Sequence, residues 1–382
     1  MGYLEDFEMA LKNHDAPALL RLWEEYTSSD EVDPEDFRSI LQVVKDSELA
    51  DCIGRHVERS LPLWEKNKGS PQSDEILRLI IDLQITNSEQ LRHLAFDYLE
   101  NKYKNDPHHN EKMRLAGMRA KNEPFKGAIS SYELLMHLKK GNYVFHSSGW
   151  GVGEVADVSF VREQGSFEFD YVAGRKDSSF KNAFNCLIPI PNNHFLALRF
   201  GTPDILEEKA KKHPVEVMHS LLRDLGPKTA AEIKDELCEL VIPAKDWARW
   251  WQTTRAKVKK DVMIESPVDL SQPFRLSRKE ISHEERLKKA LEHKPDADTL
   301  IQMVYSFLKD FPETIKNSSF KNSLLEKLSE LLSFQEISEA QLLQIHFFFK
   351  DLSPDKEYPA IADLLKHSTK IEETIKEIPI QA

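Results

Sequence analysis

The stretch GNYVFHSSGWGVGEVADV, residues 141–158, decides the fold, because the spacing of apolar residues changes here from a helical to an extended period. Tyr143, Val144 and Phe145 are aromatic or β-branched. Further segments of this kind follow, separated by turn residues, at Gly153–Val161, Ser166–Val172 and Cys186–Ile190. Four or five short strands within about 50 residues cannot build a large sheet. We therefore expect a small antiparallel β-barrel of the SH3 or Tudor kind over residues 141–191, leaning on neighbouring helices.

The residues before this stretch, 1–140, have the pattern of consecutive amphipathic helices. Ile76, Leu79, Ile80 and Leu83 illustrate it, since residues three and four apart share one helical face. Candidate helix starts recur at roughly 30 to 40 residues, the spacing of helical hairpins in a solenoid, but without the signature of a named repeat. An irregular helical bundle therefore remains the alternative. These starts lie near Tyr3, Asp33 (a predicted N-cap followed by Pro34), Pro71 and Asn110.

Helical patterns resume at Asn192 and continue to the C-terminal region. The segment ESPVDLSQPFRLS, residues 265–277, contains three prolines and little periodicity, so it is the best candidate linker. Beyond it, Ser338 and Gln341 have the spacing of a capping box at the start of a helix. The fold class is therefore mainly α, with repeat-like helical arrays flanking the barrel. The predicted parts are 1–140, 141–191, 192–265 and 278–382.

Composition excludes several functional classes. The 382 residues include 52 Lys and Arg against 64 Asp and Glu, a formal charge of −12, which argues against wrapping nucleic acid or an anionic membrane by bulk charge. There is no apolar run of about 18 residues, and the opening MGYLEDFEMALKNHD is acidic. We expect a cytoplasmic protein with no membrane partner. Cys52, Cys186 and Cys238 lie far apart, so neither a disulfide framework nor a thiolate zinc site is predicted.

No catalytic motif stands out in the chain. His108 and His109 lie beside Asp106, yet no other ligand joins them at helical spacing, and a solvated turn is the better interpretation. There is also no GxSxG elbow or HExxH pair. We expect a protein that is not an enzyme, with no cofactor, no metal and no small-molecule substrate.

The first candidate site is the glycine-rich turn GWGVG, residues 149–153. Its bare backbone could cradle a phosphate, but a strand follows it where a dinucleotide site needs a helix, so a tight turn between strands is favoured. A tryptophan between glycines is either an exposed partner contact or the plug of a small barrel. The candidate partner-binding residues are Tyr143, His146, Gly149, Trp150, Gly151 and Gly153.

The second candidate site is DWARWWQTTRAKVKK, residues 246–260, in which the tryptophans fall on one side of a helix. One interpretation makes these tryptophans core and the cations a solvated face that suits the helix C-terminus. The other combines stacking aromatic rings with phosphate-binding cations, which is how single-stranded nucleic acid is held, or docks the patch on an acidic partner. The residues of this nucleic-acid or partner patch are Trp247, Arg249, Trp250, Trp251, Arg255, Lys257, Lys259 and Lys260.

Residues 141–158 resemble the opening of a CarD-type RNA polymerase-interacting domain, a small barrel also found in transcription-repair coupling factors. In those proteins the barrel pairs with the polymerase β subunit. A longer resemblance, through roughly Gly141–Ser266 and including DWARWWQTTRAKVKKDVMIESP, is to the amino-terminal region fused ahead of Gre transcript cleavage factors in certain bacteria. The Gre portion itself, a long coiled coil with an acidic tip that helps to hold Mg²⁺, is not found in this chain, so its functional residues are carried over to no position.

The resemblance implies a non-catalytic accessory region that binds RNA polymerase, with the β subunit as the suspected contact, and regulates transcript elongation or cleavage. Nucleic acid would be held through the local basic patch. The alternative is a helical-repeat scaffold for protein–protein interaction unrelated to transcription.

Overall fold

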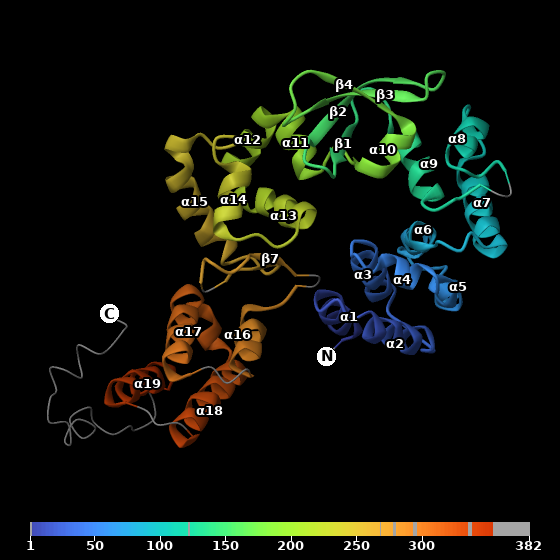
Figure 1. The fold of residues 1–382 in the computed structure, drawn as a ribbon. Helices are drawn as coiled ribbons and strands as arrows, with labels where there is room; N and C mark the ends of the chain where they lie inside the picture. Colours follow the sequence, from blue (N-terminus) through green and yellow to red (C-terminus); the bar gives the residue numbers. More distant parts are fainter. Residues whose placement is uncertain are drawn as a thin grey trace. The chain divides into compact units, whose positions relative to one another are not determined.

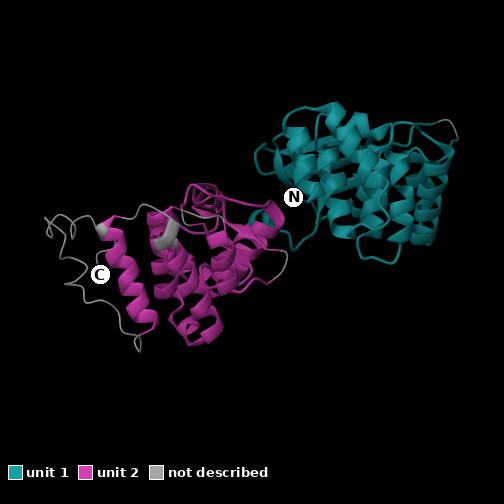
Figure 2. Ribbon diagram, turned by 90° about the horizontal axis from the view of Figure 1, so that it is seen from below, with its two compact units in different colours: residues 1–202 teal, residues 203–382 magenta. Residues whose placement is uncertain are grey.

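The computed structural model describes residues 2–120, 123–267, 269–277, 280–292, 296–334 and 338–353. The chain divides into two compact units, Met1–Thr202 and Pro203–Ala382, which Figure 2 colours separately. The four-part division expected from the sequence stays a prediction. In the described residues, no helix has both the length and the apolar content that a membrane span requires.

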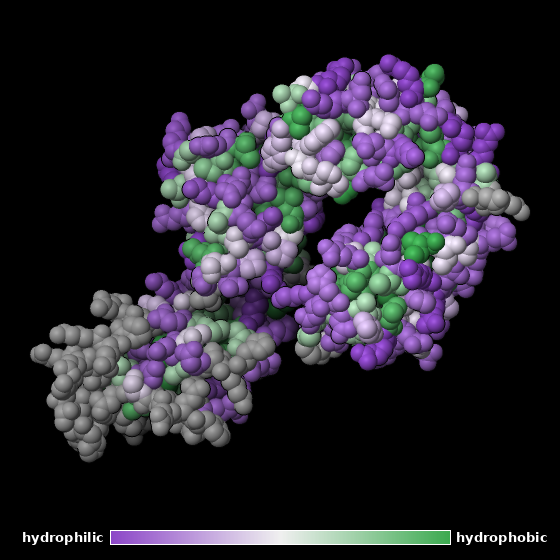
Figure 3. Space-filling model, viewed as in Figure 1, coloured by the Kyte–Doolittle hydropathy of each residue, from purple (hydrophilic) through white to green (hydrophobic). Residues whose placement is uncertain are grey.

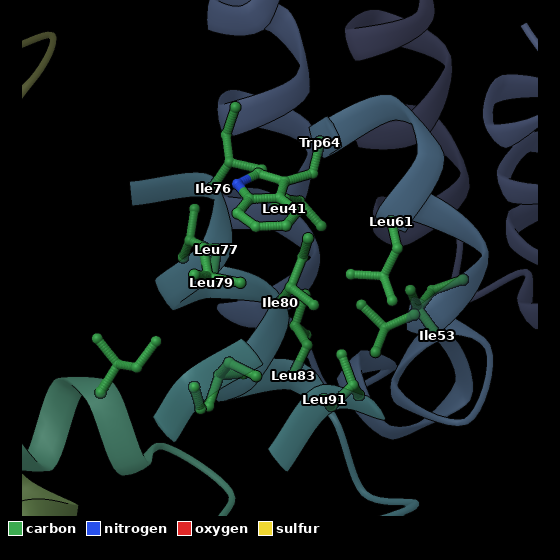
Figure 4. Close-up of a cluster of buried hydrophobic side chains, with 14 of the residues drawn as sticks. Leu41, Ile53, Leu61, Trp64, Ile76, Leu77, Leu79, Ile80, Leu83 and Leu91 are labelled. Atoms are coloured by element: carbon green, nitrogen blue, oxygen red, sulfur yellow. The ribbon is translucent and has the colours of Figure 1, made fainter. Parts of the chain in front are cut away.

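The first unit opens with a helical array whose centre is one buried helix, α6 (Figure 1). Helix α6 contacts α3, α5, α7 and α9. It buries Ile76, Leu79, Ile80 and Leu83, the predicted stripe, together with Leu77 (Figure 4). Ile81 is buried as well. Eight of the eleven residues of α6 are buried, so this amphipathic helix lies within the core of the array. The elements are α1 (Tyr3–Lys12), α2 (Ala16–Thr27), α3 (Pro34–Lys45), α4 (Ala50–Gly54), a 3₁₀ turn (Val57–Ser60), α5 (Leu61–Lys66), α6 (Ser73–Leu83), α7 (Glu89–Tyr103), α8 (His109–Leu115) and α9 (Ala128–His137).

The predicted helix start at Asp33 is confirmed. The Oδ1 atom of Asp33 accepts hydrogen bonds from the backbone N–H groups of Glu35 and Asp36, at 2.9 and 3.1 Å. Pro34 occupies the first turn of α3, where a missing N–H costs nothing. The Asp33 side chain therefore satisfies two backbone N–H groups that would otherwise lack partners at the start of α3.

A five-stranded antiparallel sheet follows the array, in the order β4-β3-β2-β1-β5. The sheet is open, not the closed barrel expected: among the described residues β4 pairs only with β3 and β5 only with β1. Helix α10 lies between these two strands in sequence and packs Phe180 and Ala183 into the sheet's core. The elements are β1 (Tyr143–His146), β2 (Gly151–Ser159), β3 (Gln164–Phe169), β4 (Arg175–Ser179), α10 (Phe180–Cys186), β5 (Leu187–Ile190) and α11 (Phe195–Gly201).

The second unit is helical, with one small hairpin. The expected linker, 265–277, contributes to this hairpin: Ile264 pairs with Leu276, Glu265 pairs with Arg275, and Phe274 is buried. Residues 354–382 of the predicted C-terminal array lie outside the described residues. The elements are α12 (Pro203–Lys212), α13 (Pro214–Leu225), α14 (Ala230–Leu237), α15 (Ala244–Val258), β6 (Ile264–Glu265), β7 (Arg275–Leu276), α16 (His283–Glu292), α17 (Ala297–Asp310), a 3₁₀ turn (Pro312–Lys316), α18 (Ser318–Phe334) and α19 (Glu339–Leu352).

The capping box predicted at the start of α19 is present. Ser338 Oγ accepts from the backbone N–H of Gln341 at 3.3 Å, and the Gln341 side chain accepts from the Ser338 N–H at 3.0 Å. Each side chain thus satisfies a donor that the helix leaves free.

Candidate functional site

The first candidate site is a cluster of aromatic rings at the turn between β1 and β2. The Trp150 indole stacks on the His146 imidazole with ring centroids 4.3 Å apart and planes 12° apart. Phe169 from β3 meets both rings edge-on, at 5.5 Å from His146 and 5.4 Å from Trp150. Stacked and edge-to-face pairs of this kind are favourable beyond the area they bury. The indole is therefore fixed in place while remaining only half-buried.

His146 stabilises the turn through a hydrogen bond to its backbone. Its side chain is buried, and its Nδ1 accepts a hydrogen bond from the backbone N–H of Ser148 at 3.2 Å. Burial lowers the pKa of His146, because the imidazolium loses its hydration. A neutral imidazole with its proton on Nε2 is the form that this acceptor role requires.

The glycines of the turn have the two roles that the sequence predicts for them. Gly149 and Gly151 have positive φ, 90° and 77°, which a side chain would strain. A Cβ on Gly151 would lie 2.8 Å from the Tyr171 ring, and one on Gly153 would lie 2.4 Å from the Phe169 ring. Glycine is therefore required at these positions, either because φ is positive or because an aromatic ring packs against the backbone.

The accessible part of this site is an end of the sheet formed by Trp150 and Tyr171, here called the Trp150–Tyr171 end. The backbone N–H of Tyr171 donates to the carbonyl of Trp150 at 3.2 Å, and the Tyr171 side chain is 66% exposed. Next to it, the loop between β3 and β4 and the Phe200 ring line an open cavity of about 510 Å³. In Figure 3 the visible surface is mainly hydrophilic, with apolar side chains in small patches. The Tyr171 ring is therefore accessible to a partner.

Tyr143 is not part of that accessible end. Its strand, β1, pairs on one side with β2 and on the other with β5, so β1 has no free edge for another strand. The Tyr143 ring lies edge-on to Phe200 at 6.4 Å and lies so close to Gly201 that a Cβ there would be 1.9 Å from the hydroxyl oxygen. Within the part of the chain that the structure describes, the unpaired edges of the sheet are β4 and β5.

The second candidate site belongs to a helix-turn-helix in the second unit. Helix α14 is followed by a turn at 238–243 and by α15, and the hairpin β6–β7 comes next. Lys228, just before α14, pairs with Phe274 at the start of the hairpin's second strand. A winged helix-turn-helix has this order of elements: a helix, a short extended segment, two helices and a paired hairpin. In a helix-turn-helix, the second helix of the motif is the one that contacts nucleic acid.

The tryptophans of α15 face inward. Trp247 is buried and stacks on Trp251 at 5.7 Å with planes 8° apart, and Trp251 meets Phe274 edge-on at 5.8 Å. The Trp250 Nε1–H donates to the carbonyl of Ala210 in α12 at 2.8 Å. Trp250 and Trp251 are half-buried, and these contacts tie α15 to α12 and to the hairpin. This packing favours the interpretation in which the tryptophans belong to the core.

The cations of the patch fall into two groups. Arg249, Lys257 and Lys260 are exposed; the first two lie on α15, and Lys260 lies in the turn that follows it. Arg255 and Lys259 are half-buried and line a second cavity with α16 and α17, where Lys259 forms an ion pair with Asp310 at 3.3 Å. The structure therefore separates the predicted patch into a tryptophan core, an outer basic face and a cavity wall.

Sequence reasoning missed the hairpin and this cavity. The hairpin strands are two residues each, too short for an alternating pattern, and the prolines around them are typical of a linker. The cavity brings together residues from α15, α16 and α17, which no local spacing connects. Its only signal in the sequence was the basic end of residues 246–260.

The comparisons with known proteins bear on both units. Residues 196–281 match the model of the GRAD helix-turn-helix domain, which covers α12–α15 and the hairpin. No solved structure gives a significant match.

Two curated relatives match nearly the whole chain. The chain is 41% identical over 364 residues to transcription elongation factor GreA of Chlamydia pneumoniae, a match that covers 94% of this chain and 50% of that protein. It is 39% identical over 331 residues to transcription elongation factor GreA of Chlamydia trachomatis serovar D, covering 87% and 46%. The chain spans about half the length of these relatives, and its similarity to them supports a relation to Gre factors.

Proposed function

We propose that this chain is a non-catalytic accessory region of a Gre-type transcription elongation factor, which binds RNA polymerase and so regulates transcript elongation or cleavage. The observation that carries the proposal is the 41% identity, over 94% of the chain, to a protein named transcription elongation factor GreA. A helix-turn-helix in the second unit is consistent with work on a nucleic-acid template.

In this proposal the sheet is a CarD-like docking module for the polymerase, with the β subunit as its contact. The Trp150–Tyr171 end supplies a rigid aromatic anchor, because the Trp150 ring is held by His146 and Phe169 before any partner arrives. Preorganised aromatic anchors lose little conformational freedom on binding. Strand addition by the partner, where it occurs, would use β4 or β5, since β1 is paired on both sides.

The outer basic face of α15 is the proposed nucleic-acid contact. Arg249, Lys257 and Lys260 are exposed and can reach phosphates. The inward packing of Trp247 and Trp251 favours a duplex or a phosphate backbone over bases stacked on these rings. The acidic residues exposed on α14, Asp235 among them, limit the affinity that charge alone can give.

The polymerase contact is tested by binding of the chain 1–382 to core RNA polymerase. Tyr171→Ala removes an exposed ring without opening the core and should weaken binding by at least about fivefold, equal to about 1 kcal/mol. Trp150→Ala should weaken it further. Val161→Ala, at a 96% exposed position in the turn between β2 and β3, is the control and should bind as the wild type does. Wild-type affinity in both aromatic variants would reject the docking module, and absence of polymerase binding by the wild type would favour the scaffold alternative.

The nucleic-acid contact is tested separately by its salt dependence. Arg249→Ala with Lys257→Ala should weaken duplex binding uniformly across sequences and reduce the slope of log K against log salt by about one for each lost phosphate contact. Lys211→Ala with Lys212→Ala removes two exposed cations from α12, each already in an ion pair with a glutamate, and should have little effect. Equal effects of the two pairs would mean that only net charge matters.

A further inference from the structure

We propose that the cavity between the end of α15, α16 and α17 is a binding site for a nucleoside phosphate. The cavity has a volume of about 640 Å³, within the range of small-molecule sites, and combines a cationic rim with an apolar floor. This proposal is independent of polymerase binding by the first unit, and nothing in it requires the outer basic face of α15.

The wall of the cavity is fixed by the half-buried guanidinium of Arg286. Arg286 from α16 donates through Nη1 to the carbonyls of Asp261 and Ile264, at 3.3 and 2.7 Å, and through Nη2 to that of Val262. These bonds hold the segment between α15 and the hairpin against α16. The Arg286 Nε and the Ser266 hydroxyl, both in the cavity wall, are buried and have no hydrogen-bond partner among the described residues. Buried polar atoms without partners mark places where a ligand or water can bind.

The charges that line the cavity do not cancel. Lys259 and Asp310 form an ion pair. The Glu265 carboxylate accepts from the Ser277 hydroxyl at 2.8 Å and partly offsets the burial that lowers the pKa of Arg286. Arg255 and Lys289 also line the cavity, and neither forms an ion pair with a carboxylate in the part of the chain described here. Two positive charges therefore lack a counter-charge, which matches a phosphate dianion better than a single carboxylate.

The floor of the cavity suits a flat heterocycle. Helix α17 contributes Met303 and Phe307, and the Phe311 ring stacks on His283 with centroids 4.0 Å apart and planes 20° apart. Burial lowers the pKa of His283, so its ring is neutral and part of an apolar surface at neutral pH.

Polar groups stand beside this floor. Gln302 and Ser306 also line the cavity and lie four residues apart on α17, hence on one face of the helix. Their amide and hydroxyl can donate to and accept from the edge of a base. An apolar floor with a few convergent polar groups and an anion-binding rim is the arrangement that recognises a nucleotide.

The test measures binding of mant-ADP by the full chain 1–382, followed by fluorescence. We expect saturable binding, competition by AMP and ADP, and at least tenfold weaker competition by adenosine, which lacks the phosphate. The phosphate could belong to a free nucleotide or to the end of a nucleic acid, and a 5′-phosphorylated oligodeoxyadenylate of four nucleotides distinguishes these two ligands. If the oligonucleotide competes at least as well as AMP, the site binds a nucleic-acid end. If it competes less well than AMP, the site binds a free nucleotide. Either result supports the proposal.

Two variants and a control locate the site. Arg255→Gln with Lys289→Gln should weaken mant-ADP binding at least tenfold, equal to about 1.4 kcal/mol. Ser306→Trp, at an exposed rim position, fills the cavity without changing charge and should abolish binding. Lys211→Gln with Lys212→Gln removes the same charge from the exposed face of α12, outside the cavity lining, and should leave binding unchanged. Circular dichroism melting checks that each variant is folded.

Three results would overturn the proposal. The first is absence of saturable mant-ADP binding by the wild type at millimolar concentration. The second is equal loss in the cavity pair and in the control pair, which would reduce the effect to net charge. The third is tighter binding of an acidic peptide with phenylalanine anchors than of any nucleotide, which would make the cavity a peptide site. None of these results depends on whether the chain binds RNA polymerase.

Discussion

Gly153 shows how one missing side chain fixes the aromatic cluster of the sheet. A Cβ at this position would lie 2.4 Å from Phe169 Cδ1, and the Phe169 ring in turn meets His146 and Trp150. Gly153→Ala should displace that ring and lower the free energy of unfolding by about 1–3 kcal/mol, the usual range for overpacking. Urea denaturation measures the loss. Gly69→Ala, with nothing within 4 Å of the added Cβ, is the control and should change stability by less than about 0.5 kcal/mol. Equal losses would contradict the close approach.

His146 makes the sheet sensitive to acid. Burial lowers its pKa in the folded state below the unfolded value of about 6.5. Below pH about 6.5 the unfolded chain therefore binds a proton that the folded chain resists, and stability falls as pH falls through the folded-state pKa. Above pH about 6.5 the stabilising contribution is complete.

This acid sensitivity is tested by comparing melting temperatures between pH 7.5 and 5. His146→Asn keeps an acceptor for the Ser148 N–H and removes the titrating group. As the pH is lowered over this range, the melting temperature of the variant should fall less than that of the wild type. Above pH 7 the melting temperatures of the two proteins should depend on pH in the same way. Parallel curves for the two proteins would mean that His146 is not buried as a neutral ring.

Single residues also show where sequence reasoning ends. The spacing of Gly149, Gly151 and Gly153 predicted a tight turn, because only the local backbone determines that need. The packing of Tyr143 on Gly201, and of His146 on Phe169, could not be predicted, since these partners lie far away along the chain. Which candidate residue is accessible therefore depends on tertiary contacts.

At the scale of elements, the start of α3 depends on one carboxylate. Asp33 Oδ1 accepts from two backbone N–H groups, and α3 then buries Phe37, Ile40 and Leu41. Asp33→Ala should cost about 1 kcal/mol and lower the melting temperature accordingly. Asp30→Ala removes a fully exposed carboxylate shortly before it and should change stability by less than about 0.5 kcal/mol. A similar drop in both variants would point to net charge and not to capping.

The elements that the sequence did not predict are those without an apolar period. Strand β4, Arg175–Ser179, is polar throughout and lies at an edge of the sheet, so it has no alternation to detect. Helix α10, Phe180–Cys186, is too short for a helical stripe to stand out among strands. Among the described residues β4 and β5 do not pair with each other, so the sheet is open where a closed barrel was expected. The long helices, in contrast, were predicted from their stripes.

At the scale of the first unit, helix α9 belongs to two cores. Ala128, Ile129 and Tyr132 pack in the core of the helical array, whereas Leu134 and Leu135 pack with the strands. The sequence could not predict this division, because the pattern of apolar residues in a helix does not show which core each of its faces packs against. The sheet core is therefore completed by a helix that precedes the predicted boundary at residue 140.

The shared helix predicts how fragments of the unit behave. Residues 141–202 carry every strand of the sheet but lack α9, and each buried leucine of α9 contributes roughly 1.5–3 kcal/mol. The two leucines together contribute about 3–6 kcal/mol, a large part of the 5–15 kcal/mol or so that stabilises a small domain. The fragment 141–202 should therefore be unfolded or aggregated. The fragment 128–202, which restores α9, should regain near-ultraviolet circular dichroism, and 1–202 should unfold cooperatively. A dispersed amide NMR spectrum from 141–202 alone would contradict the shared core and would place a true domain boundary at residue 140.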